Sequence, residues 1–145
     1  MLPVFLLCAA IIVTLVVGNL LSKAGAEPGS LQADDRGFVD SKVRCEAPQS
    51  AVAFGRTEQS LVAICVDRDG HYEYRGARLG DDAVLTVVAE PTVPGEFFAQ
   101  KDGATYTVTA KELVIKTDEW VRAEPVLQFG APPLLAVEMP ASNPR

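Results

Sequence analysis

Short runs of alternating hydrophobic and polar residues fill most of the chain after residue 45. Turn residues separate them, notably Asp67-Arg68-Asp69-Gly70, Gly80-Asp81-Asp82 and Asp102-Gly103. An alternation of period two predicts strands that are buried on one face. Turns spaced by about 8–12 residues are typical of a small antiparallel sandwich or barrel. We therefore predict an all-β domain of seven to eight short strands, drawn from residues 50–54, 60–66, 71–79, 83–89, 97–100, 105–109, 113–116, 120–122 and 126–129.

The amino-terminal pattern is different, because residues 2–22 contain no charged side chain. As a helix this run would span about 31 Å, which matches the apolar thickness of a bilayer. It predicts one transmembrane helix with its amino terminus inside the cell and the domain outside. A signal peptide cleaved after Ala26 is the alternative, because Ala24-Gly25-Ala26 fits a cleavage site. No basic residue precedes the apolar run, which favours the anchor.

Composition divides the rest of the chain into three parts. Residues 23–44 are polar and without a clear period, so we expect a linker there. Residues 45–129 hold the β pattern and are expected to form the domain. Residues 130–145 contain four prolines, which predicts an extended tail.

Cys45 and Cys65 are the only cysteines outside the apolar segment, which contains Cys8. Both readings of that segment export the domain to an oxidising compartment, so we predict a disulfide between them. No CxxC motif occurs and His71 is the single histidine, so we expect neither a metal site nor a cofactor. Asp67-Arg68-Asp69-Gly70 begins like a calcium loop, but Cys65 and Gly76 would fall at ligand positions, which favours a plain turn.

The charge balance excludes one class of partner. The chain has 48% hydrophobic residues and a formal net charge of −6, and all 19 acidic residues lie at Glu27 or later. An acidic domain is repelled by phosphate backbones, so nucleic acid is not an expected partner. No nucleophile motif or phosphate loop is present, and we predict no enzymatic activity. Glycan hydrolysis is the least excluded reaction, because it needs only two carboxylates.

Two stretches, CVDRDGHYEYRGARLGDDAVL and FFAQKDGATYTVTAKELVI, resemble segments of small exported proteins from actinobacteria that have no assigned activity. The resemblance covers about residues 60–127. It implies export and a β domain, and it brings no catalytic residues.

Arginines and phenylalanines supply the candidate contact residues. Arg75 and Arg78 suit an anionic group, and Phe97 or Phe98 could be an apolar anchor, since neighbours on a strand point to opposite faces. About 85 residues can fill a small barrel but leave little room for a cavity. The sequence thus favours a membrane-tethered interaction module that docks on an envelope protein. The alternative is a tethered or secreted β-barrel that binds a small anionic or lipidic ligand.

Overall fold

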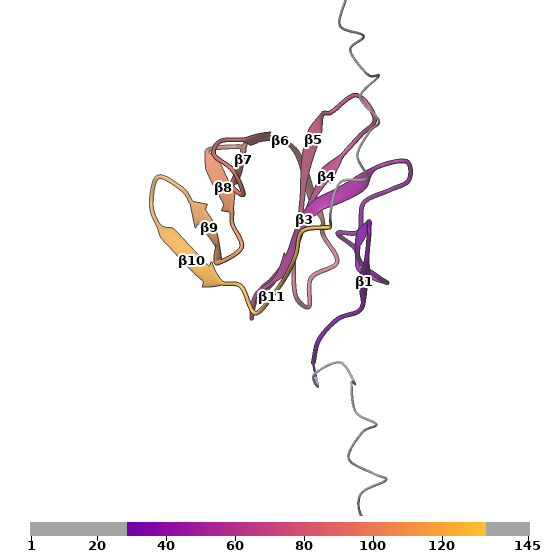
Figure 1. The fold of residues 1–145 in the computed structure, drawn as a ribbon. Helices are drawn as coiled ribbons and strands as arrows, with labels where there is room; N and C mark the ends of the chain where they lie inside the picture. The colour runs from indigo at the N-terminus through magenta and orange to yellow at the C-terminus, as the bar shows by residue number, and fades with distance from the viewer. Residues whose placement is uncertain (1–28, 133–145) are drawn as a thin grey trace, which may run out of the picture. The chain divides into compact units, whose positions relative to one another are not determined.

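The structure is a computed structural model that describes residues 29–132, and every regular element in that range is a β-strand (Figure 1). The first sheet contains β1 (Ala33–Asp34) and β2 (Gly37–Phe38). The second sheet contains β3 (Ser50–Arg56), β4 (Ser60–Val66), β5 (Tyr72–Arg78), β6 (Leu85–Pro91), β7 (Phe97–Lys101), β8 (Ala104–Val108), β9 (Glu112–Lys116), β10 (Val121–Pro125) and β11 (Gln128–Gly130). The predicted all-β, antiparallel class is confirmed, with nine strands in the main sheet.

The main sheet is a meander whose last segment connects its two edges. From β3 to β10 each strand pairs with the next, whereas β11 pairs with β3 at the opposite edge. Only Val126 and Leu127 lie between β10 and β11. Their amides donate to the carbonyls of Lys111 and Arg56, at 2.9 and 2.8 Å. The sheet has to curl, because so short a connection can join the edges only if they lie close together.

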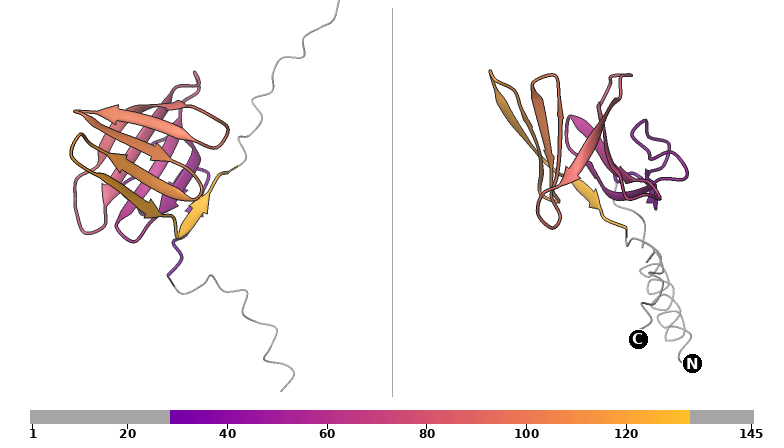
Figure 2. Two further views of the ribbon diagram at one scale, coloured as in Figure 1. Left: turned by 90° about the vertical axis from the view of Figure 1, so that its left-hand side faces the viewer. Right: turned by 90° about the horizontal axis from the view of Figure 1, so that it is seen from above.

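Curling brings the two halves of the sheet face to face. Figure 2 shows the β7–β10 half crossing over the β3–β5 half, with the chain passing between them through β6. The result combines features of the predicted sandwich and barrel. The predicted membrane helix, residues 2–22, lies outside the described residues, as does most of the tail. Within residues 29–132 no helix is long and apolar enough to cross a membrane.

The concave face of the curled sheet holds the larger core. Alternate residues of each strand point to this face, so the period of two in the sequence sorts the core from the outer surface. Tyr72 and Phe97 pack at its margin, with ring centroids 5.6 Å apart. The buried members of this core are Ala53, Val62, Ile64, Tyr74, Ala89, Ala99, Val108, Leu113 and Ile115.

A second core forms where residues 31–49 pack on the convex face of β3, β4 and β5. Phe38 and Val43 are completely buried there. The Phe38 ring meets Phe54 of β3 edge to face, with centroids 4.9 Å apart. The linker predicted over residues 23–44 is therefore wrong for residues 31–44, which belong to the domain. Those residues make only a two-stranded ladder, so their sequence carries no strand period.

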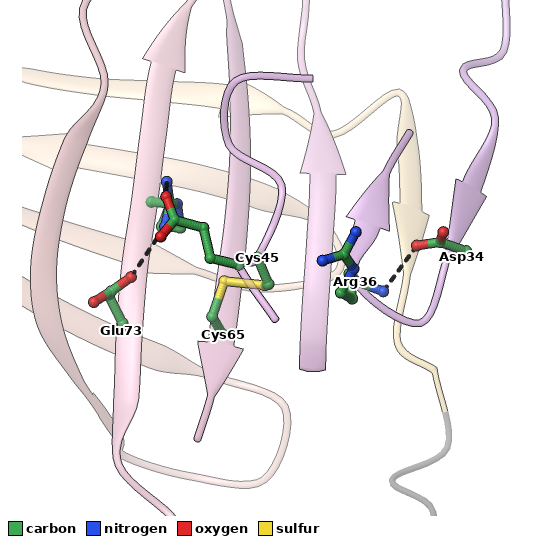
Figure 3. The surroundings of a disulfide bond; sticks show 7 residues. Asp34, Arg36, Cys45, Cys65 and Glu73 are labelled. Atoms are coloured by element: carbon green, nitrogen blue, oxygen red, sulfur yellow. Dashed lines mark hydrogen bonds and ion pairs between the residues drawn. A yellow bond between two sulfur atoms is a disulfide. The ribbon is translucent and has the colours of Figure 1, made fainter. Parts of the chain in front are cut away.

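The disulfide predicted between Cys45 and Cys65 is present and attaches this amino-terminal segment to β4 (Figure 3). Both cysteines are buried in the second core, with Ala51, Phe54 and Ala63 around them. The bridge closes a loop with a sequence separation of 20. It thereby limits how far residues 31–44 can separate from the sheet when the chain unfolds.

Replacing Cys45 and Cys65 together by alanine should lower the free energy of unfolding by about 3 kcal/mol, the loss expected for a loop of this length. Urea unfolding of the full chain, followed by circular dichroism, measures the change. Cys8→Ala is the matched control, because it removes a thiol and leaves the bridge intact. Equal stability of the double variant and the control would show that the bridge does not hold the second core.

Candidate functional site

A cavity of about 610 Å³ opens between the two halves of the curled sheet, and we call it the interior cavity. Its wall is formed by strands from both halves and by the loop between β5 and β6. Most of the lining is apolar or aromatic, with a few charged groups among it. The lining residues are Ser60, Tyr74, Gly76, Ala77, Arg78, Asp81, Ala83, Val84, Leu85, Tyr106, Ile115, Trp120 and Arg122.

Two tyrosines form one wall of the interior cavity. Tyr74 of β5 and Tyr106 of β8 come from opposite halves of the sheet, and their ring centroids lie 5.0 Å apart. Gly76, two residues after Tyr74 on the same face, leaves space for the Tyr74 ring, because a Cβ at this position would clash with the hydroxyl group. Burial raises the pKa of Tyr74, and the nearby Tyr106 and Glu124 raise it further. Tyr74 therefore stays neutral, and the wall it forms stays uncharged.

A buried carboxylate closes the sheet beside the cavity. Glu124 of β10 is only 4% exposed. One of its oxygens accepts a hydrogen bond of 2.7 Å from the Thr57 hydroxyl in the turn between β3 and β4. The other oxygen lies 2.7 Å from Nε of Arg122. The Thr57 hydroxyl and the Arg122 guanidinium thus both approach this carboxylate, and Glu124 links β10 to the turn between β3 and β4.

Arg122, Trp120 and Arg78 provide the polar part of the cavity wall. The Arg122 guanidinium lies 5.3 Å from the centre of the Trp120 ring, a cation–π distance. Trp120 keeps 45% of its surface exposed. Arg78 ends β5 at the rim and is exposed. An arrangement of aromatic walls and a few cationic groups suits an apolar molecule with a polar end.

The contact residues predicted from sequence separate in the structure. Arg75 and Arg78 are three residues apart on β5 and so lie on opposite faces. Arg75 is nearly buried on the convex face between Glu46 and Glu73, with N···O distances of 3.3 and 3.5 Å. Phe97 packs into the concave core, while Phe98 lies half-buried on the other face. Of these residues, only Arg78 lines the interior cavity.

Asp67, Asp69 and His71 cluster at the hairpin turn between β4 and β5. Their ligand atoms lie within 4.8 Å of one another. One Asp67 oxygen accepts the amides of Asp69 and His71, each at 2.9 Å, and the other lies 3.1 Å from the His71 ring. The hydrogen bond from the His71 amide is the main cause that lowers the pKa of Asp67. These contacts account for the cluster as a turn, and we assign it no ion.

Comparison with known proteins does not add to this picture: the chain matches no protein-family model, no curated protein and no solved structure. Sequence reasoning missed Tyr106, Arg122 and Glu124 as members of one site. The alternation along β5 could have placed Tyr74, Gly76 and Arg78 on one face. The short connection from β10, which pairs with β9, to β11, which pairs with β3, is what brings in Arg122 and Glu124.

Arg122→Met should lower the free energy of unfolding by about 3 kcal/mol, because it leaves the buried Glu124 charge without its partner. The double variant Arg122→Met, Glu124→Gln should recover most of this loss, since an uncharged amide no longer needs a cation. Urea unfolding of the single and double variants measures both effects. A double variant as unstable as the sum of its single changes would contradict this role for the pair.

Proposed function

We propose that this domain binds a small, largely apolar molecule in the interior cavity. The observation that carries the proposal is the open space between the two sheet halves, which the core side chains leave unfilled. Its volume of about 610 Å³ lies within the range of small-molecule sites. Tyr74, Leu85, Tyr106 and Ile115 offer apolar contact, and arginines at the wall offer orientation.

The ligand-binding alternative is preferred over the docking module for two reasons. Arg75 already has two carboxylate partners and Phe97 packs into the core, while Arg78 and Phe98 lie on opposite faces of the sheet, so these residues form no common docking surface. The expectation of a filled interior is also wrong. A cavity of about 610 Å³ remains between the two halves, lined by Tyr74, Leu85, Tyr106 and Ile115 among others.

Export of the domain is a further part of the proposal. The uncharged run of residues 2–22 supports a membrane anchor, with cleavage after Ala26 as the alternative. The buried Cys45–Cys65 disulfide supports an oxidising compartment, where such bonds persist. On this proposal, the domain binds its ligand outside the cytoplasm and close to the membrane.

Leu85→Trp should abolish or strongly weaken ligand binding, because residue 85 lines the cavity and an indole would occupy part of its volume. Dodecanol serves as the probe. Native mass spectrometry of the full chain released from nanodiscs reports adducts of one molecule per chain. We expect such adducts with the unmodified chain. Leu85→Trp should weaken the affinity for dodecanol by about tenfold or more, since blocking apolar contacts of this size costs about 1.4 kcal/mol or more.

Val88→Trp is the matched control, because Val88 lies on the same strand but 76% exposed on the outer face. This variant should bind dodecanol like the unmodified chain. Thermal unfolding of both variants at the midpoint of the unmodified chain shows that neither change disrupts the fold. Equal adduct formation by both variants would mean that the probe does not enter the interior cavity, and would contradict the proposed function.

A further inference from the structure

We infer that the ligand of the interior cavity is a monoanionic amphiphile, a carboxylate attached to an apolar chain, and that Arg78 binds its carboxylate. The inference rests on the proposed function and specifies its ligand class. It is drawn from the ion pairs of the cavity wall, which leave one cation without a partner.

Arg78 carries a charge that the domain does not neutralise. It lines the cavity and is exposed at the rim. Within residues 29–132 each of the ion pairs involves another cation, and no carboxylate pairs with Arg78. The backbone of Arg78 pairs with Ser60 of β4, which fixes where the side chain begins. A guanidinium in this position offers a planar fork of donors to a carboxylate.

Asp81 does not take up this charge, although it lines the same cavity. One of its oxygens accepts the amide of Ala83 at 3.0 Å, and its own amide donates to the Arg78 carbonyl at 3.2 Å. These bonds use Asp81 to shape the loop that follows β5. The loop thereby holds Ala83 and Leu85 at the cavity wall and leaves the Arg78 guanidinium open to a ligand.

Arg122 adds donors but little net charge. Glu124 meets its guanidinium at Nε, which leaves the two Nη groups to donate to a ligand. Counting Arg78 and Arg122 against Asp81 and Glu124, the cavity and its buried carboxylate are together neutral. One carboxylate can therefore be held by Arg78 alone, whereas a second negative charge on the ligand would find no further unpaired cation in the cavity wall. The apolar remainder of the ligand is expected to lie along Leu85, Tyr106 and Ile115.

A series of twelve-carbon probes that differ only in the head group tests this inference. Trp120 is the sole tryptophan of the chain and lines the cavity, so its fluorescence reports occupancy. The full chain is placed in phosphatidylcholine nanodiscs, and binding is plotted against the free probe concentration measured after dialysis. Dodecanoate should bind about tenfold or more tightly than dodecanol or dodecyl phosphate, the gain expected for one charge-assisted contact.

Arg78→Gln should weaken dodecanoate binding by about tenfold or more, to the level of dodecanol. Arg68→Gln is the matched control, since Arg68 is also an exposed arginine, lies in the β4–β5 turn and does not line the cavity. Equal binding of dodecanol and dodecanoate by the unmodified chain would overturn the inference and leave the proposed function standing. If dodecyl phosphate bound more tightly than dodecanoate, the inference that the ligand carries a single carboxylate would be overturned. Binding of no probe at all would contradict the proposed function as well.

Discussion

One buried carboxylate, that of Glu124, links the two edges of the curled main sheet at the point where they meet. Glu124 lies near the end of β10, which pairs with β9. Just after it, the chain crosses to β11, which pairs with β3 at the other edge. The Thr57 hydroxyl donates to Glu124 and accepts the amides of Gln59 and Ser60, at 3.1 and 2.8 Å. One contact thus joins the β3–β4 turn to β10. Glu124 also forms an ion pair with Arg122 in the cavity wall. The same carboxylate therefore contacts both the opposite sheet edge and a charged group of the cavity.

Space inside the sheet follows from which side chains face inward. Alanines at positions 53, 89 and 99 fill little of the concave face, and Gly76 gives its place to the Tyr74 ring. Larger side chains fill other positions of the same core, where Ile64, Val108 and Leu113 are fully buried. The concave face is therefore packed over much of its area and leaves a cavity beside Gly76 and Leu85. Meanwhile the amino-terminal segment covers the convex face of β3–β5, so that half of the sheet is supported from outside.

Much of the fold could be predicted from local sequence signals. Alternation and turn residues gave the strands, and the count of cysteines gave the disulfide, since each depends on neighbours or on the compartment. The role of residues 31–44 could not be predicted, because Phe38 and Val43 are buried by long-range packing without a strand period. The roles of Arg122 and Glu124 could not be predicted from the sequence for a similar reason. Thr57, which donates to Glu124, is 67 residues away from it in the sequence. The pairing of β11 with β3 brings the two residues together.

The central claim is that the open interior of the curled sheet is a binding site. The most direct test measures nuclear Overhauser contacts between the chain protons of bound dodecanoate and the methyl groups of the protein. We predict contacts to Leu85 and Ile115, which line the cavity, and none to Val88 and Val114, which lie on the outer face of the same strands. Contacts confined to the outer methyl groups would contradict the account.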